Sequence, residues 1–225
     1  MNLPPTSPTP ASGRVMTVAQ IKDAEAATMR HTPESELMDR ASQAVAEQSL
    51  ALLAAHGVSV DDARIVVLVG SGNNGGDALL AGALLAADVG TVTAVGVGPS
   101  AHERGLATLT GAGGHWHHAR VDAGLASAHT ALASAHLVID GIVGIGSKPN
   151  LREPAAGLVA AIAPETPVIA VDIPSGFDAD SGALPDSYVT AEATVTFTAL
   201  KPCLVLSPAN AAAGKVIVAD VGIDP

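Results

Sequence analysis

A glycine-rich segment, residues 70–77 with the sequence GSGNNGGD, contains the residue types best suited to hold an anion. It follows an apolar run that predicts a strand at 64–69 and precedes a run that predicts a helix at 76–88. Glycines let the backbone approach a ligand closely, and the amides at the start of a helix point toward a bound anion. The segment therefore predicts a site for a phosphate-bearing ligand, although G-x-G-x-x-G alone is a weakly specific pattern.

The strand predicted next, at residues 91–97, argues against an ordinary NAD-dependent oxidoreductase. Such enzymes place an acidic residue at the end of this strand to hold the adenosine ribose. Here the strand ends VGVGP, and the nearest acid, Asp88, precedes it. The distinctive residues of the loop are instead Asn73, Asn74 and Asp77. A carboxylate in the first helical turn beside a phosphate needs a cation or a hydrogen-bonding bridge.

Two further aspartates end apolar runs that are typical of buried parallel strands. Asp140 ends the run LVID, and Asp172 ends the run VIAVD. Loops punctuated by glycine or proline follow both residues, at 141–149 and 173–182. Because ligands of open α/β sheets bind outside the carboxyl ends of the strands, we expect both aspartates and the glycine loop to converge on one pocket.

Composition limits the possible classes of protein. The chain has 225 residues, of which 48% are hydrophobic and only 2% aromatic, so one α/β domain with an aliphatic core is expected. A net charge of −11 argues against nucleic acid or an anionic membrane as a partner. Asp88 and Gly90 interrupt the apolar stretch 79–95, so no transmembrane segment is expected. A single cysteine, Cys203, rules out an intrachain disulfide and is compatible with a reducing, cytoplasmic location.

Strand and helix patterns alternate along the chain, which predicts a Rossmann-like, three-layer α/β/α sandwich around a mostly parallel sheet. Two additional helices are expected ahead of the first strand. Residues 1–14, rich in proline, serine and threonine, are expected to be a disordered tail, and 15–225 a single domain. The predicted strands are 64–69, 91–97, 115–120, 136–140, 167–172, 192–198 and 215–219, and the predicted helices 18–29, 36–55, 76–88, 101–112, 123–133, 154–163 and 208–213.

These motifs together resemble the NAD(P)H-hydrate epimerases, the YjeF N-terminal domain family. The resemblance rests on the glycine loop, on a lysine eight residues after Asp140, on VDIPSG at 171–176, and on the flanking segments LMDRA (37–41) and VTFTALKP (195–202). It extends from about Met16 to Ile223 in the expected order. One departure is Ala78, where the family usually has glycine; a helical position would tolerate this change.

The resemblance implies interconversion of the R and S epimers at C6 of hydrated NADH and NADPH, called NADHX and NADPHX. It implies Asp172 as the group that moves the proton, with Lys148 assisting or stabilising charge on oxygen. The implied cation site uses Asn74, Asp140 and Ser175, with potassium as the family's ion; oxygen ligands favour a hard cation but leave potassium and magnesium open. The substrate would contact Asp172 and two segments, Asn73, Asn74, Gly75, Gly76 and Asp77 on one side and Gly144, Ile145, Gly146, Ser147 and Lys148 on the other.

The resemblance also implies partners. Many relatives carry a fused dehydratase domain, and this chain ends just after its last predicted strand, so a separate ADP/ATP-dependent NAD(P)H-hydrate dehydratase is expected to act with it, unless the chain is a fragment. A homodimer through the N-terminal helices is expected by analogy.

Two other functions remain open: a non-catalytic binding or scaffold module of the same fold, and a magnesium-dependent nucleotide or sugar-phosphate enzyme. The sequence shows no arginine obviously placed to distinguish NADPHX from NADHX.

Overall fold

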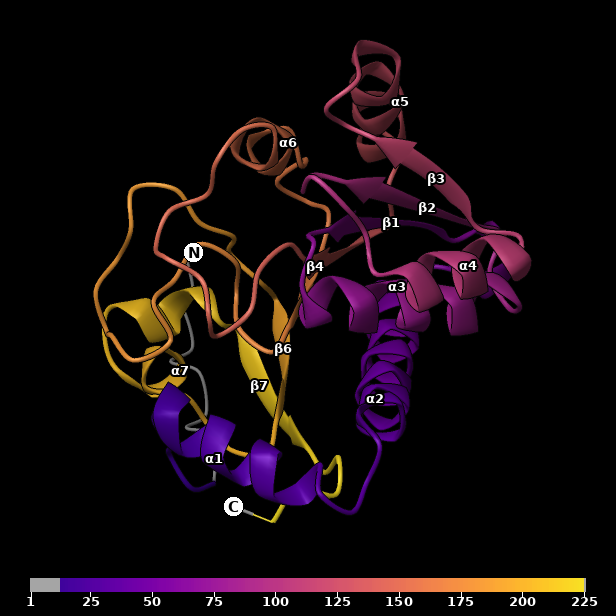
Figure 1. The fold of residues 1–225 in the computed structure, drawn as a ribbon. Coiled ribbons are helices and arrows are strands. Elements are labelled where there is room, and N and C mark those ends of the chain that lie inside the picture. Colours follow the sequence, from indigo (N-terminus) through magenta and orange to yellow (C-terminus); the bar gives the residue numbers. More distant parts are fainter. Residues whose placement is uncertain (1–12, 225) are drawn as a thin grey trace.

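The computed structural model describes residues 13–224, whose strands form one seven-stranded sheet (Figure 1). The strand order is β3-β2-β1-β4-β5-β6-β7, and every neighbouring pair is parallel. The predicted mostly parallel sheet is thus confirmed, and in these residues it is parallel throughout. The strands are β1 (Arg64–Val69), β2 (Thr91–Gly96), β3 (His115–His118), β4 (Leu137–Gly141), β5 (Val168–Val171), β6 (Ala193–Phe197) and β7 (Lys215–Ala219).

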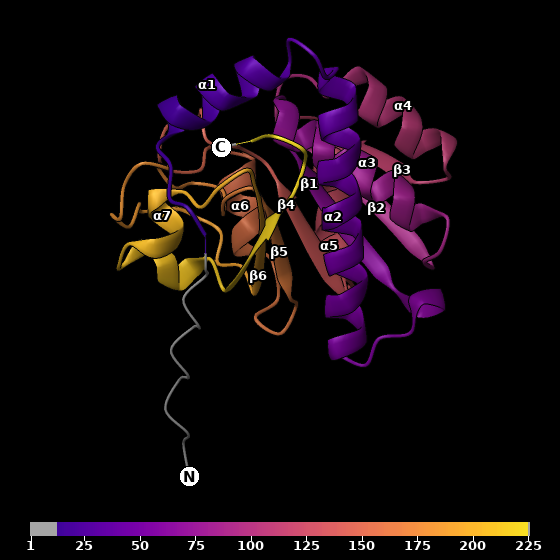
Figure 2. The same cartoon turned by 90° about the horizontal axis from the view of Figure 1, so that it is seen from below.

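Helices cover both faces of the sheet, which confirms the three-layer sandwich (Figure 1, Figure 2). The longest is α2 (Glu34–Ala55), which packs with α3 (Asn73–Ala86) and α4 (Glu103–Gly111) on one face. The opposite face is covered by α5 (Asp122–Leu132) and α6 (Ala155–Ala160). Central strands such as β1 are buried on both faces, which is why they read as continuous apolar runs.

The described chain has four further helical elements, of which η1 precedes β1 and the others lie beside the β6 and β7 end of the sheet (Figure 1). The predicted N-terminal helix is present as α1 (Val18–Thr28), and its N-cap Thr17 forms a capping box with Gln20. The described segment before it belongs to the fold as well, because the Leu200 amide donates to the Arg14 carbonyl at 2.9 Å. Residues 1–12 of the expected tail lie outside the described residues. The short elements are η1 (Val60–Asp62), α7 (Pro202–Val205) and η2 (Ala209–Ala212).

Some predicted boundaries were wrong. Helix α3 begins at Asn73 rather than at residue 76, because Gly72 serves as its N-cap and the two following glycines are helical. The predicted helix 154–163 ends at Ala160, and 208–213 is a 3-10 turn. Helix α7 was not foreseen, since four residues carry too little periodicity to be recognised. Within the described residues, no helix has the length and apolar character needed to cross a membrane.

The glycine loop lies directly against the segment that follows β4. The Gly70 amide donates to the Gly141 carbonyl at 3.0 Å. A Cβ at position 70 would lie 1.7 Å from the Ile142 carbonyl oxygen, and one at position 75 would lie 2.2 Å from the Gly70 oxygen. The backbone of the glycine loop therefore contacts the backbone after β4 at the carboxyl ends of β1 and β4. The strand order changes direction between these two strands, and open α/β sheets bind ligands at such a point.

We expect Gly70→Ala to lower the free energy of unfolding by about 1 to 3 kcal/mol, because the added methyl group must displace backbone rather than a flexible side chain. Gly111→Ala is the matched control, since a Cβ there has nothing within 4 Å and the residue is helical. Urea unfolding of both variants measures the difference. Equal stability of the two variants would contradict this account of the loop.

Candidate functional site

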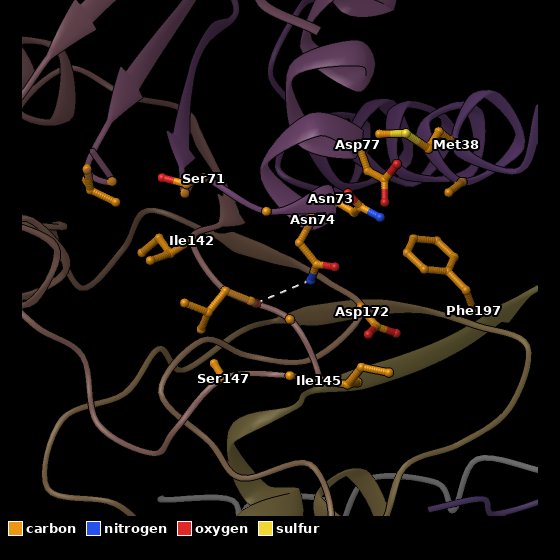
Figure 3. A pocket seen from close by; sticks show the side chains of 18 of the residues that line it. Met38, Ser71, Asn73, Asn74, Asp77, Ile142, Ile145, Ser147, Asp172 and Phe197 are labelled. Atoms are coloured by element: carbon orange, nitrogen blue, oxygen red, sulfur yellow. Dashed lines mark hydrogen bonds between the residues drawn. The ribbon is translucent and has the colours of Figure 1, made fainter. Parts of the chain in front are cut away.

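A cavity of about 740 Å³ opens at the carboxyl ends of the strands, beside the glycine loop (Figure 3). Its volume lies in the range expected of a ligand pocket. Most of the residues predicted to contact substrate line it, as the sequence predicted: Asn73, Asn74, Asp77, Gly144, Ile145, Gly146, Ser147, Lys148 and Asp172.

Gly75 and Gly76 do not line the cavity, and their role in the structure is close packing. Gly75 lies against the Gly70 backbone, while a Cβ at Gly76 would lie 2.7 Å from the Met38 methyl and 2.8 Å from the His102 ring. The absence of side chains lets α3 start directly behind the loop. Its first-turn residue Asn73 turns its side-chain amide to Glu34 Oε1, at 2.6 Å.

The departure at Ala78 fits the fold. The residue is fully buried in α3, and its methyl group faces Gly141, where an added Cβ would lie 2.4 Å away. The contact between α3 and β4 therefore uses the glycine of β4, and the alanine at position 78 is accommodated in the helix.

The three residues of the expected cation site are connected through one backbone segment. Asn74 Nδ2 donates to the Val143 and Val171 carbonyls at 3.2 and 2.8 Å. The Val143 amide donates to Ser175 Oγ at 3.0 Å, and the Ser175 amide donates to Asp140 Oδ2 at 2.8 Å. Asn74, Asp140 and Ser175 are therefore brought together. Asn74 lines the cavity, but Asp140 and Ser175 are fully buried and do not line it, so the expectation that Asp140 opens into the same pocket was wrong.

The chemistry of this cluster suits a hard cation. Asp140 is fully buried, and burial raises its pKa to about 6 against the opposing effect of hydrogen bonds from Ser175 and Ile142. No cationic side chain contributes to that shift. The described residues contain no group of three His, Cys, Asp or Glu side chains that could hold a metal ion. A cation here would therefore rely on one carboxylate with amide, hydroxyl and carbonyl oxygens, which fits a hard ion.

Asp172 sits at the end of β5 in a constrained conformation. Its φ is +70°, in the left-handed region that is uncommon for residues other than glycine. Its amide donates to the Val195 carbonyl at 2.7 Å, and its Oδ1 accepts from Thr196 Oγ1 at 3.2 Å and from Lys201 Nζ. The constraint aims the carboxylate into the cavity while fixing one of its two oxygens (Figure 3).

Lys201 is the cationic partner of Asp172, and sequence reasoning did not assign it a role. Its side chain is 1% exposed and also donates to Thr196 Oγ1 at 2.8 Å and the Phe197 carbonyl at 2.9 Å. Thr198, with φ of +66°, turns the chain so that Lys201 returns beside β5. The available signal was a single lysine within the apolar run TALKPCLV, because a buried lysine requires a partner.

Asp77 is a second buried carboxyl group of the cavity. It is 6% exposed, and its Oδ1 has no hydrogen-bond partner. Burial raises its pKa well above the usual value, and Asp172, Glu34 and Glu25 raise it further. Burial also raises the pKa of Glu25, with Asp172 as the next contribution. The N-terminal helices, expected only to mediate a homodimer, therefore supply the acidic groups Glu25 and Glu34 to the cavity.

The loop that carries Lys148 closes another side of the cavity. Its Gly144 lies against Asn74, so that a Cβ there would be 2.6 Å from Asn74 Oδ1. Ser147 Oγ is buried with no hydrogen-bond partner. Lys148 is exposed at the rim and forms no ion pair with Asp172 in the described structure; the ammonium group on Asp172 is that of Lys201.

Comparison with known proteins identifies relatives over nearly the whole chain. The NAD(P)H-hydrate epimerase of Clavibacter michiganensis subsp. michiganensis is 40% identical, over 92% of this chain and 93% of the relative. The bifunctional NAD(P)H-hydrate repair enzyme Nnr of Mycobacterium tuberculosis (strain ATCC 25618 / H37Rv) is 38% identical over 92% of this chain, which spans 41% of that relative's length.

A solved structure agrees with the fold. The crystal structure of yeast ynu0, YNL200c, superimposes with a TM-score of 0.72 and 23% identity, covering 84% of this chain and 82% of the yeast chain. Residues 34–203 match the family described as YjeF-related protein N-terminus. With the glycine loop, the Asp140 cluster and Asp172 in their expected places, the chain belongs to the YjeF_N family.

Proposed function

We propose that this chain interconverts the R and S epimers of hydrated NADH and NADPH at C6 of the nicotinamide ring, in the repair of nicotinamide cofactors. The observation that carries the proposal is the Asp172 carboxylate, held by a buried lysine at a cavity that the glycine loop also lines. The 40% identity to a relative named NAD(P)H-hydrate epimerase supports the same reaction.

The reaction needs a group that moves a proton at the C6 hydroxyl. In one route the hydroxyl is protonated and leaves as water, the ring nitrogen forms an iminium, and water adds to the other face. In the other route the hydroxyl loses its proton, the C6–N bond breaks to give an aldehyde, and the ring closes on the other face. Asp172 can serve either route, because Lys201 and Thr196 hold Oδ1 and leave Oδ2 for the substrate.

Lys148 is proposed to act on the oxygen from the opposite side. Its exposed position at the rim suits a residue that reaches the ligand when the loop 144–148 closes. An ammonium group near C6 would stabilise negative charge that develops on oxygen. We assign Lys201 a different, positioning role, since it is fully committed to Asp172, Thr196 and the Phe197 carbonyl.

The diphosphate is proposed to bind at the start of α3, where backbone amides and the helix dipole favour an anion. Asp77 lies in this first turn, and an ionised carboxylate there would repel a phosphate. Its raised pKa favours the protonated form, in which the carboxyl group can donate a hydrogen bond to the ligand. This assignment removes the conflict of two negative groups in one pocket.

A potassium ion is proposed at Asn74, Asp140 and Ser175, with carbonyl oxygens of the same segment. When bound, it would supply positive charge beside the fully buried Asp140 and order the loop that follows β4.

We retain the sequence-based expectations of a homodimer, a separate dehydratase partner, a domain spanning 15–225 and a cytoplasmic location. The expected cytoplasmic location rests on Cys203, a buried free thiol.

We expect Asp172→Asn to lower turnover by ~10²-fold or more without weakening dinucleotide binding, because an amide cannot exchange the proton. The assay supplies the R epimer of NADHX and an S-specific dehydratase and follows the NADH regenerated, in potassium and in sodium buffer. The exposed Asp186→Asn is the control. No acceleration by folded wild-type protein would overturn the proposed function, and near-normal turnover of Asp172→Asn would remove this residue from the mechanism.

We expect Lys201→Met to lower turnover and to move the acid limb of the pH–rate profile to higher pH, because a buried carboxylate that has lost its ammonium partner binds a proton more readily. Removing one partner of a buried ion pair also lowers the free energy of unfolding by about 3 to 5 kcal/mol. Thermal unfolding must therefore show that the variant is folded at the assay temperature. A folded variant with an unshifted pH–rate profile would show that Lys201 does not position Asp172.

We expect Asp77→Asn to be more stable than the wild type at pH 8 and of similar stability near pH 3. Because the folded-state pKa of Asp77 is raised, the wild type loses stability as the pH rises from the unfolded pKa through the folded one, and the neutral amide does not. Urea unfolding across this pH range measures the gap. A gap that does not widen with pH would contradict the burial of a titrating carboxyl group at this position.

A further inference from the structure

Asp77 is a buried polar side chain that the protein leaves incompletely satisfied. The residue is 6% exposed, and among the described residues its Oδ1 has no hydrogen-bond partner. Buried polar atoms nearly always have a partner, so each exception needs an explanation. Asp77 lines the cavity, which indicates that its carboxyl group serves a ligand rather than the fold.

Asp77 and Asp172 face the cavity from opposite sides (Figure 3). Asp77 extends from α3 and Asp172 from the residue after β5, and Phe197 lies on the wall between them. The two carboxyl groups are close enough for Asp172 to contribute to the raised pKa of Asp77. The start of α3, where the diphosphate is proposed to bind, adjoins this space, so the nicotinamide ring of the same ligand can lie between the two groups.

The two carboxyl groups have opposite electrostatic surroundings. Asp172 forms an ion pair with the Lys201 ammonium group. Burial raises the pKa of Asp77 well above its usual value, and neighbouring charges alter it further. The carboxylates of Asp172, Glu34 and Glu25 raise it, and the Arg104 guanidinium group lowers it. Surroundings that differ in this way assign one carboxyl group of a pair as the acid and the other as the base.

Inversion at C6 by the iminium route requires proton transfer on both faces of the ring. On one face the hydroxyl must gain a proton to leave as water, and on the other face the water that adds must lose a proton. One carboxyl group cannot reach both faces of a bound ring. The ring-opening route has no such requirement, because the same oxygen serves as hydroxyl and as aldehyde. Two opposed carboxyl groups therefore favour the iminium route.

We propose that Asp77 is a second proton-transfer residue, which acts on the face of the nicotinamide ring opposite Asp172. This role rests on the proposed epimerase function. In one direction the Asp77 carboxyl group protonates the C6 hydroxyl, the C–O bond breaks as water leaves with the bonding electrons, and the lone pair of the ring nitrogen forms the iminium. Water then adds to C6 from the other face and gives its proton to the Asp172 carboxylate.

The same pair serves the reverse reaction with the roles exchanged, so that Asp172 is the acid and Asp77 the base. Proton exchange with solvent restores the starting state after each turnover. The proton comes from Asp77, which is buried and held by α3, rather than from Lys148, which is exposed at the rim. Lys148 retains its proposed role in stabilising charge on oxygen.

Asp77→Asn separates proton transfer from ligand binding, because an amide keeps a hydrogen-bond donor but cannot give up a proton. We expect turnover to fall by ~10²-fold or more, with KM within about threefold of the wild type. Asp88→Asn is the matched control and should match the wild type, since Asp88 is exposed just after the same helix and does not line the cavity. The neutral amide has the shape of the carboxyl group, so the variant is expected to fold.

The outcomes distinguish this role from the reaction itself. No acceleration by folded wild-type protein would overturn the proposed function. Acceleration by the wild type together with near-normal turnover of folded Asp77→Asn would overturn only the role of Asp77, as would a loss that appears entirely in KM.

Isotope labelling tests the route. The R epimer of NADHX is incubated with the protein in water enriched in oxygen-18, without the dehydratase, and the S epimer formed is analysed by mass spectrometry against a protein-free sample. We expect the S epimer to carry oxygen from the solvent, because the original hydroxyl leaves as water. An S epimer that keeps its original oxygen would indicate ring opening, and would overturn the paired role of Asp77 and Asp172 while leaving the proposed function intact.

Discussion

The buried ion pair between Asp172 and Lys201 is the interaction on which the site depends. A carboxylate 5% exposed at the end of a central strand is unfavourable without a partner, and the partner comes from a different part of the chain, after β6. Two left-handed residues, Asp172 and Thr198, bring the groups together. Such backbone conformations cost free energy and persist where the surrounding structure holds them, as it does here through Thr196 and the Phe197 carbonyl.

The second constraint is the lack of space between the glycine loop and the segment after β4. Gly70 and Gly75 allow contacts between backbone atoms that no side chain would permit. The same closeness places Asn74 within hydrogen-bonding distance of the Val143 and Val171 carbonyls, and through Val143 it connects to Ser175 and Asp140. The proposed phosphate site and the proposed cation site are therefore two sides of one packed junction.

Several carboxyl groups line the cavity. Glu25, Glu34 and Asp172 are close enough to Asp77 to raise its pKa beyond the effect of burial. With a net charge of −11, the chain is proposed to hold the diphosphate through local backbone amides rather than through a basic surface. Asp77 is compatible with the proposed phosphate site, since its burial favours the uncharged form.

The sequence by itself determined the layered α/β fold, the seven strands and the convergence of the glycine loop and Asp172 on one cavity, whereas Asp140, expected in the same pocket, is fully buried and does not line it. These features follow from local patterns: apolar runs, glycine positions, and the rule that parallel strands end at one edge. Only the tertiary structure decided that Lys201 pairs with Asp172 and that Glu25 and Glu34 enter the cavity. Those contacts join residues distant in the chain, and their geometry depends on how helices and loops pack over the sheet, which no local pattern records.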